Sequence, residues 1–197
     1  VVDDDAINRK KLRIAVANLG HDAETAVDGR EALEMLAGGK FDAVLLDIVM
    51  PEMDGFDVLD RMRATPSMRD VPVIVVSALD DETESVVRAI ELGAEDFLPK
   101  SFDLVILKAR LEASLSRKRF RDQEKEYFGR IERLTEAAEK LERGRFDPDS
   151  LALDDLVRHS DPLGRLAAVF RGMANEIYER ELKLHRAVAT LQGGFLV

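Results

Sequence analysis

Charged and polar side chains stand directly after several short apolar runs of this sequence. Asp3 to Asp5 follow the first run, Asp47 ends the second, Ser77 closes the third and Lys100 follows the last. Residues just beyond the carboxyl ends of parallel strands gather at one edge of the sheet. Carboxylates that converge there repel one another and need a cation, and two or three hard oxygen ligands with room for water suit Mg²⁺. The pattern therefore predicts a magnesium site at this edge.

A metal beside a carboxylate, with an ammonium and a hydroxyl nearby, is suited to moving a phosphoryl group. An oxygen of one aspartate would attack phosphorus, the metal and the lysine ammonium would neutralise the equatorial oxygens, and the hydroxyl would donate a hydrogen bond to one of them. The simpler alternative is that Asp3 to Asp5 cap a helix, and Asp5 is expected to do so. Capping explains Asp4 and Asp47 poorly, because they follow separate strands.

The strands that would position these residues are recognisable by length and β-branching. The runs 41–46 and 71–76 are typical of buried strands, and shorter strands are expected at Val1-Val2, near Val27 and at Phe97-Leu98. Amphipathic helical patterns lie between them, with apolar residues on one face of segments 12–19, 32–36, 58–62, 86–90 and 104–111. Left-handed C-caps are expected at the helix-ending glycines, Gly20, Gly38-Gly39 and Gly93.

Repeated strand–helix units imply parallel strands joined by right-handed crossovers. We therefore predict an α/β fold, a doubly wound five-stranded parallel sheet with helices on both faces. The chain of 197 residues is long enough for one large domain or two small ones, and its 46% hydrophobic content excludes wholesale disorder.

Composition also limits the functional classes. The absence of Cys excludes a disulfide scaffold and a thiolate metal site. The net charge of −10, most of it before residue 120, argues against a nucleic-acid partner. No apolar run approaches the roughly 18 residues needed to span a bilayer, and no signal peptide is visible. The sequence predicts a cytoplasmic protein without membrane insertion.

After residue 116 the strand patterns stop, and apolar residues recur at helical spacing instead. A heptad seam comprises Tyr127, Ile131, Leu134, Ala138 and Leu141, and a second seam runs from Leu163 to Leu191 after a connector rich in Pro and Asp. A dimeric bundle buries two such seams better than a single hairpin does, so we predict a homodimer through parallel C-terminal helices. The basic run 117–121 is interpreted as a solvated helix face.

Four segments, VVDDD, LLDIVMPEMDG, VIVVSAL and GAEDFLPK, resemble in order and spacing the receiver domain of two-component response regulators over residues 1–118. The resemblance implies a flavodoxin-like fold and a phosphoacceptor at Asp47. It also implies Mg²⁺ held by Asp4, Asp47 and the backbone carbonyl of Val49, with Asp3 acting through water. The phosphoryl donor would be a histidine kinase or a phosphotransfer protein.

The same resemblance makes Ser77 the switch hydroxyl, Phe97 the aromatic side chain that packs inward when Ser77 turns to the phosphoryl group, and Lys100 the cationic partner. Some positions depart from the family pattern. Ser101 follows Lys100 where the family usually has a proline with a cis peptide bond, and Pro99 precedes it instead. Apolar residues, Val49 and Leu79, occupy positions where receivers that lose phosphate quickly often carry polar residues, which predicts a long-lived acyl phosphate.

The tail resembles a HAMP domain over residues 128–180. The resemblance lies in Gly144-Arg145-Phe146 of the connector and in Asp161-Pro162-Leu163-Gly164 at the start of the second helix. Asp161 is expected at the N-cap and Pro162 at the first helical position. A generic parallel coiled coil is the alternative, and both predict the same homodimer. The expected organisation is a receiver at 1–118 followed by a HAMP-like or coiled-coil signalling and dimerisation region at 119–192.

The leading hypothesis is a response regulator in a phosphorelay. Phosphorylation of Asp47 would bias the dimeric helical region and, through it, a missing or separate effector. Such a protein would catalyse only its own phosphorylation and dephosphorylation. One alternative is a magnesium-dependent phosphohydrolase with an aspartyl-phosphate intermediate, but such enzymes generally need a second acid where Val49 stands. The other is a dimerisation scaffold with a silent receiver.

Overall fold

The computed structural model describes residues 1–78, 83–144 and 147–193. The chain divides into two units, unit 1 (Val1–Arg121) and unit 2 (Asp122–Val197). The predictions about Leu79 and Phe146, and the side chain of Leu191, lie outside the described residues.

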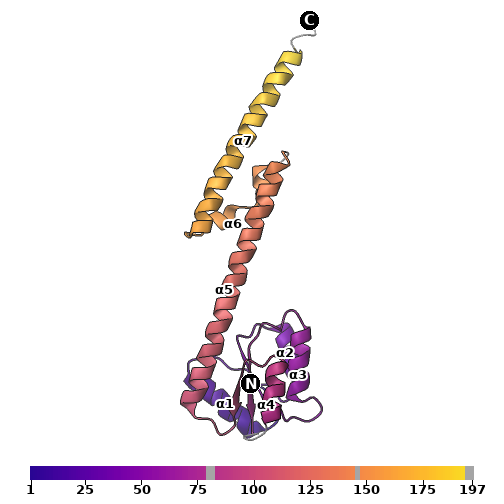
Figure 1. Cartoon of the computed structure of the whole chain (residues 1–197), viewed down its shortest axis with the longest axis vertical. Coiled ribbons are helices and arrows are strands. Elements are labelled where there is room, and N and C mark those ends of the chain that lie inside the picture. Colours follow the sequence, from indigo (N-terminus) through magenta and orange to yellow (C-terminus); the bar gives the residue numbers. More distant parts are fainter. Residues whose placement is uncertain (79–82, 145–146, 194–197) are drawn as a thin grey trace. The chain divides into compact units, whose positions relative to one another are not determined.

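Unit 1 alternates helices and strands, as Figure 1 shows. Its elements are α1 (Ala6–Asn18), α2 (Gly29–Gly38), β1 (Val44–Leu46), α3 (Gly55–Ala64), β2 (Val73–Ser77), α4 (Thr83–Glu91), β3 (Asp96–Pro99) and the first part of α5 (Leu104–Glu142). The three strands form one parallel sheet in the order β1-β2-β3, with Val44 opposite Val73 and Ile74 opposite Asp96.

The prediction of five strands is not confirmed, because the described residues form three strands and two isolated bridges. Val2 pairs in parallel with Ala26 on one side and with Leu46 of β1 on the other. The expected strands at Val1-Val2 and near Val27 therefore contribute a single paired residue each, and Val27 is half exposed beside Ala26. The expected strand at Phe97-Leu98 is confirmed as β3. The order across the sheet is Ala26, Val2, β1, β2, β3, which keeps the doubly wound topology.

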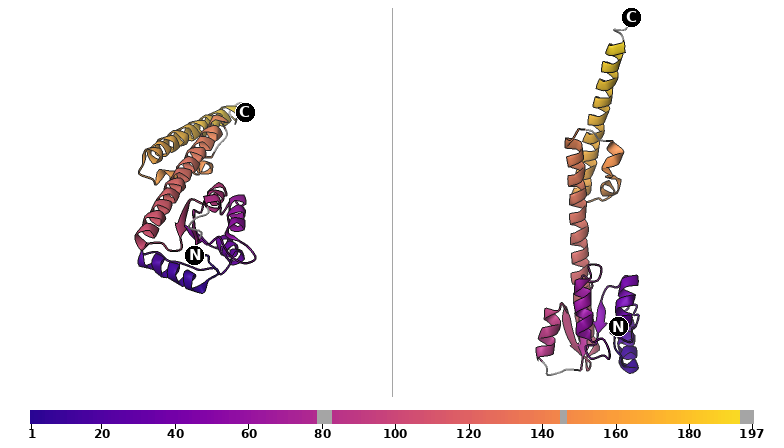
Figure 2. Two further views of the ribbon diagram at one scale, coloured as in Figure 1. Left: turned by 60° about the horizontal axis from the view of Figure 1, so that its bottom comes forward. Right: turned by 90° about the vertical axis from the view of Figure 1, so that its right-hand side faces the viewer.

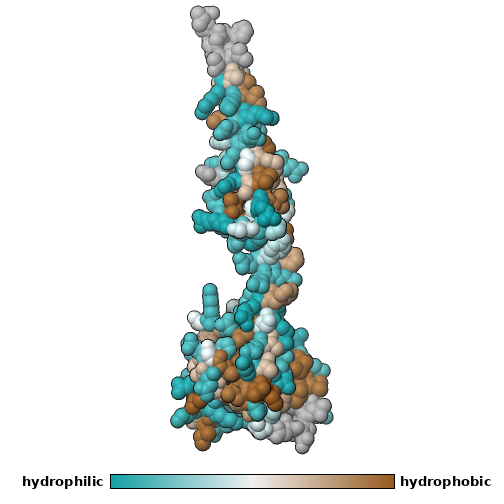
Figure 3. Space-filling model, turned by 90° about the vertical axis from the view of Figure 1, so that its left-hand side faces the viewer, coloured by the Kyte–Doolittle hydropathy of each residue, from teal (hydrophilic) through white to brown (hydrophobic). Residues whose placement is uncertain are grey.

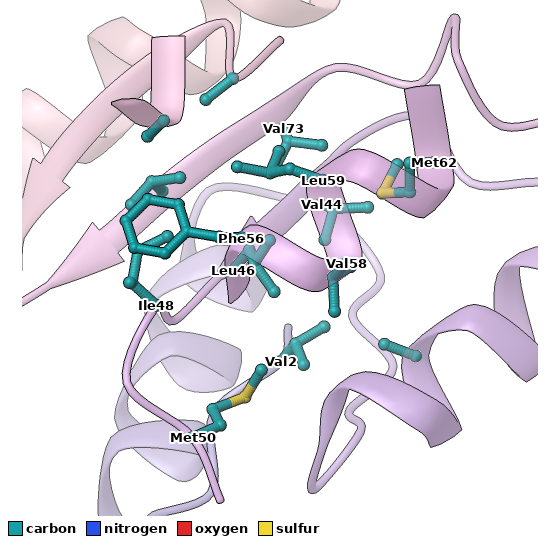
Figure 4. Packing of buried hydrophobic residues seen from close by; sticks show 14 of the residues in the cluster. Val2, Val44, Leu46, Ile48, Met50, Phe56, Val58, Leu59, Met62 and Val73 are labelled. Atoms are coloured by element: carbon teal, nitrogen blue, oxygen red, sulfur yellow. The ribbon is translucent and has the colours of Figure 1, made fainter. Parts of the chain in front are cut away.

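The strands are buried on both faces. One core contains Val2, Val44, Leu46 and Val73 with residues of α2, α3 and α4, and Figure 4 shows its side chains packed together. The second core joins strand residues that face the other way to α1 and α5: Leu12, Ala15, Val16, Leu45, Ile74, Val76, Leu98, Leu107 and Leu111. The alternation of strand residues between the two cores places helices on both faces of the sheet (Figure 2).

Aspartates start three of the helices in unit 1. Asp5 accepts hydrogen bonds from the backbone N–H groups of the first turn of α1, as expected from the sequence. Asp28 caps α2, and Asp54 forms a capping box with Asp57 at the start of α3. Part of the acidic excess thus satisfies helix N-termini that would otherwise lack acceptors.

Two local predictions in unit 1 are confirmed and two are wrong. Gly20 and Gly93 have positive φ angles of 84° and 103°, as a left-handed cap requires. Gly39 instead is extended, with φ −125° and ψ 171°. On α4 the predicted apolar face is wrong, because Val87 and Ile90 are half exposed and Ala89 is buried instead.

The basic run at residues 117–121 is not simply solvated. Arg117 and Arg121 both donate hydrogen bonds to the carboxylate of Glu95, at 2.7 and 3.0 Å. Lys118 Nζ lies 3.8 Å from Asp42 Oδ1. These contacts join α5 to residues just before β3 and β1. They lie at the amino-terminal ends of the strands, whereas Asp47 and Lys100 lie at the carboxyl-terminal ends.

Unit 2 is helical. It contains the rest of α5, a 3₁₀ turn η1 (Pro148–Leu151), α6 (Asp154–Val157) and α7 (Pro162–Gly193). α5 and α7 run in the same direction, and the connector between them returns to the start of α7 (Figures 1 and 2). The core of this unit contains Ala137, Leu151, Leu153, Leu156, Ala167 and Ala174. Ala138, expected on the first seam, is exposed, and its neighbour Ala137 is buried.

Ion pairs join the connector to α5. Arg130, which is nearly buried, donates to both oxygens of Asp161 at 2.7 and 2.9 Å, and Asp161 also accepts from Gly164 N at 2.8 Å. Asp161 is therefore the N-cap of α7 and Pro162 its first residue, as predicted. Both terminal nitrogens of Arg133 donate hydrogen bonds to the carboxylate of Asp155 in α6.

Much of the second apolar seam is exposed in the single chain. Its exposed side chains are Leu166, Met173, Ile177, Leu184 and Val188, each between 41% and 60% exposed. Figure 3 shows hydrophobic side chains interrupting the polar surface of the helical unit. No helix that the structure describes is long and apolar enough to cross a membrane.

Candidate functional site

Three loops meet at the carboxyl ends of the strands. Asp3 follows Val2, Asp47 follows β1, and Lys100 follows β3. Backbone hydrogen bonds fix these positions: Asp47 N donates to Val2 O at 2.9 Å, and Lys100 N donates to Ser77 O at 2.9 Å. Asp3, Asp47 and Ser77 are almost fully buried, whereas Asp4 is exposed.

The three predicted carboxylates converge. Oxygens of Asp3, Asp4 and Asp47 all lie within 4.8 Å of one another. Asp3 Oδ1 accepts a hydrogen bond from Asp5 N, and its buried Oδ2 has the Lys100 ammonium as its partner among the described residues. Three converging carboxylates, two of them buried, fit a hard divalent cation such as Mg²⁺.

Lys100 lies between the two buried carboxylates. Its Nζ is 2.6 Å from Asp47 Oδ2 and 2.9 Å from Asp3 Oδ2. Burial acts to lower the pKa of Lys100, but the hydrogen bonds and negative charges of Asp47 and Asp3 outweigh it and raise the pKa. Lys100 is therefore held in its charged form.

For the carboxyl group of Asp47, the effect of burial on the pKa outweighs the effect of its hydrogen-bond partners. Burial raises the pKa of its carboxyl above the ordinary value, and the charge of Asp3 adds to this, against the lowering effect of Lys100 and of Val49 N–H. Val49 N lies 3.3 Å from Asp47 Oδ1. A buried carboxylate next to another carboxylate is destabilised in its charged form, so an added cation would stabilise this site.

Ser77 and Phe97 lie beside this cluster. Ser77 is the last residue of β2, and its carbonyl accepts the Lys100 N–H at 2.9 Å. Phe97 sits in β3 opposite Val75 and is partly buried against the core on the α2–α4 face. The structure thus brings the side chains of Asp3, Asp4, Asp47 and Lys100 together, whereas Ser77 meets the backbone of Lys100 and Phe97 packs against the core from β3.

The loop 50–55 shapes the approach to Asp47. Met50 and Met53 are buried, and Gly55 N donates to Ile48 O at 2.9 Å. A Cβ atom on Gly55 would lie 2.4 Å from the carbonyl oxygen of Asp47. Gly55 is required because the start of α3 passes directly over the backbone of Asp47.

Two basic residues of α1 also reach the site and were missed by sequence reasoning. Arg9 Nη1 donates to the backbone carbonyls of Asp3 and Asp4 at 2.7 and 2.8 Å. Lys11 Nζ donates to the backbone carbonyl of Lys100 at 2.9 Å. Contacts with backbone carbonyls leave no side-chain pattern in the sequence, and a basic residue on the exposed side of α1 resembles any solvated lysine.

Comparison with known proteins agrees with this geometry. Residues 1–112 match the family described as response regulator receiver domain, so the chain belongs to that family. The response regulator MprA of Mycolicibacterium vanbaalenii is 44% identical over 117 residues, which are 59% of this chain and 49% of that protein. The chain thus spans about half the length of the curated relatives it matches.

Solved structures give the same fold. The signal receiver domain of a signal transduction histidine kinase from Syntrophus aciditrophicus matches with a TM-score of 0.53 and 32% identity, covering 58% of this chain and 88% of that one. The receiver domain of a sensor histidine kinase from Pseudomonas aeruginosa, solved with a magnesium ion coordinated in its active-site cleft, matches with a TM-score of 0.55 and 25% identity over 58% and 93% of the two chains. Unit 1 has the flavodoxin-like receiver fold.

Proposed function

We propose that Asp47 accepts a phosphoryl group from a histidine kinase or a phosphotransfer protein, and that this chain is the receiver of a two-component phosphorelay. The observation that carries the proposal is the contact of Lys100 Nζ with Asp47 Oδ2 at 2.6 Å, at the point where Asp3 and Asp4 converge on the same carboxylate. An ammonium and a metal-binding pair of acids around one carboxylate suit phosphoryl transfer better than any structural role.

Asp4, Asp47 and the backbone carbonyl of Val49 would hold Mg²⁺, with Asp3 acting through water. The receiver domain from Pseudomonas aeruginosa that binds magnesium in its cleft supports this assignment. The ion would neutralise the carboxylate cluster and the incoming phosphoryl oxygens. A cation held there would oppose the burial and the charge of Asp3, which together raise the pKa of Asp47.

The chain's own groups then do the positioning. An oxygen of Asp47 attacks phosphorus in line with the departing histidine nitrogen. Lys100 Nζ moves from the Asp47 carboxylate to an oxygen of the phosphoryl group, and the Val49 N–H stays within reach of that group. The Ser77 hydroxyl turns to another phosphoryl oxygen, and Phe97 fills the space that Ser77 leaves, which repacks the sheet edge near β3.

Two other functions make different chemical predictions. A phosphohydrolase using Asp47 as nucleophile needs an acid or base two residues later, where the structure has the exposed apolar side chain of Val49. A silent receiver would not retain the converging acids and Lys100. Incubation with acetyl phosphate and Mg²⁺ separates the three: we expect stable addition of one phosphoryl group. Continuous donor hydrolysis without addition indicates the hydrolase, and neither addition nor hydrolysis indicates the scaffold.

We also propose that unit 2 is a HAMP-like or coiled-coil region that pairs with a second copy and carries the phosphorylation signal to an effector. Its support is the parallel course of α5 and α7 and the apolar stripe on α7 that the single chain leaves exposed, including Met173 and Ile177. Most of the side chains that a coiled coil would bury point away from the monomer's own core.

Light scattering on two matched variants tests this dimer. Met173→Glu places a charge in the stripe and is expected to shift the protein to monomers. Asn175→Glu adds the same charge two residues later, on a different side of α7, and is expected to leave the dimer intact. A monomeric wild type, or equal behaviour of the two variants, would contradict the proposal.

A further inference from the structure

The backbone of Lys100 is held from two sides. Its N–H donates to Ser77 O within the sheet, and its carbonyl accepts from Lys11 Nζ of α1, both at 2.9 Å. The first contact belongs to the strand ladder. The second comes from a helix 89 residues earlier in the chain and is made by a side chain alone.

Lys11 has a second anchor in the same turn. Its Nζ lies 4.6 Å from the centroid of the Phe102 ring, close enough for a cation–π contact. Phe102 N in turn donates to Pro99 O at 3.0 Å, and its ring packs against the core between α1 and α5. Lys11 therefore bridges the carbonyl of Lys100 and the aromatic ring two residues later.

The backbone after Lys100 is less restricted than the backbone before it, where Pro99 stands. Ser101 follows Lys100, so no proline ring fixes the backbone at that position. The described peptide bonds are all trans. The turn is contacted by Lys11 of α1, and α1 is packed into the core through Leu12 and its neighbours.

We infer that Lys11 is a positioning residue for phosphoryl transfer: it fixes the turn that aims the Lys100 ammonium at Asp47. The inference rests on the proposed phosphoacceptor role of Asp47. Lys11 touches neither the carboxylates nor the reacting atoms by any contact described above; it acts through the carbonyl of Lys100. Without it, the turn loses a charge-assisted hydrogen bond and a cation–π contact, and Lys100 samples orientations away from Asp47.

The test compares Lys11→Met with Lys11→Arg and Lys10→Met. Met keeps the length and packing of the side chain but cannot donate, Arg can both donate to the carbonyl and stack on Phe102, and Lys10 is the exposed neighbour on the same helix. With acetyl phosphate and Mg²⁺, we expect Lys11→Met to be phosphorylated about tenfold more slowly, which corresponds to about 1.4 kcal/mol. Lys11→Arg and Lys10→Met should react at rates near that of the wild type.

A second readout reports the position of Lys100 directly. Brief acetylation with a lysine-reactive ester, followed by peptide mass spectrometry, gives the reactivity of Lys100 relative to Lys118 in the same chain. We expect this ratio to rise several-fold in Lys11→Met alone, because an ammonium released from its two carboxylates loses protection, whereas general unfolding would expose both lysines.

Failure of the inference and failure of the proposed function look different. If the wild type takes up no phosphoryl group, the proposed role of Asp47 is wrong. If the wild type is phosphorylated but Lys11→Met matches it in rate, or slows without a change in the Lys100 to Lys118 ratio, Lys11 does not position Lys100.

Discussion

Replacing Gly55 with alanine should destabilise the fold and slow the proposed phosphorylation of Asp47 together. A Cβ atom at this position would lie 2.4 Å from the carbonyl oxygen of Asp47 and 2.8 Å from the Cα of Ile48. Both neighbours are backbone atoms, so no side-chain rotation relieves the contact. To reach an ordinary van der Waals distance of 3.4 Å from that oxygen, α3 and the loop after β1 must separate by about 1 Å.

Overpacking of this kind costs about 1–3 kcal/mol. Each kcal/mol lowers the melting temperature of a domain of this size by roughly 2–8 °C. Because the displaced atom belongs to Asp47, the proposed phosphoacceptor, the reaction should be affected too: a misplacement of about 1 Å can cost on the order of 100-fold in rate. Gly55→Ala should therefore melt earlier and accept phosphate far more slowly than the wild type.

The control is Gly38→Ala at the end of α2, where an added Cβ would meet nothing within 4 Å. Alanine there should be neutral or stabilise by up to about 1 kcal/mol. Thermal melts followed by circular dichroism give the stabilities, and acetyl phosphate labelling gives the rates. If Gly55→Ala matches Gly38→Ala in both melting temperature and labelling rate, α3 does not constrain the acceptor as described.

Three further outcomes are expected. In unit 2, Gly164→Ala should destabilise the start of α7, because the added Cβ atom would collide with a backbone carbonyl of the connector. Gly172→Ala, where an added Cβ atom meets nothing nearby, should stabilise the helix by up to about 1 kcal/mol. Urea unfolding that ranks the two variants in the opposite order would contradict this packing. The hydrogen bonds from Arg133 lower the pKa of Asp155 from 3.8 to about 2, so this pair stabilises the fold above pH 3.8 and the contribution disappears as the pH falls towards 2. The difference in melting temperature between wild type and Arg133→Gln should accordingly shrink over that range, and a constant difference would exclude the ion pair as its cause. Finally, the acyl phosphate of the wild type should be long-lived and Val49→Glu should shorten its lifetime; a wild-type lifetime of seconds after donor removal would contradict the role given to the apolar side chain.

The chemistry of the site was accessible from the sequence because it depends on topology. Once parallel strands are recognised, the residues that follow Val2, β1 and β3 must share one edge of the sheet, and the structure places Asp3, Asp47 and Lys100 there. This prediction does not depend on strand length. The predicted convergence of these residues therefore holds even though Val2 and Ala26 form only single-residue bridges.

Other features could not be predicted because they depend on approach distances and on partners remote in sequence. Nothing in the residues around Gly55 reveals that α3 passes over the carbonyl of Asp47. The partner of Arg117 and Arg121 is Glu95, and helical periodicity alone does not identify it. On α5, Ala137 rather than Ala138 faces the core, because the connector leucines pack on a side of the helix that a simple heptad assignment does not anticipate.

The most direct test of the account is the intact mass of the protein after incubation with acetyl phosphate, with and without Mg²⁺, for the wild type and for Asp47→Asn. We predict that the wild type gains the mass of one phosphoryl group only when Mg²⁺ is present, and that Asp47→Asn gains none. Addition to Asp47→Asn at the wild-type level, or addition to the wild type that is indifferent to Mg²⁺, would contradict the assignment of Asp47 as a magnesium-dependent phosphoacceptor.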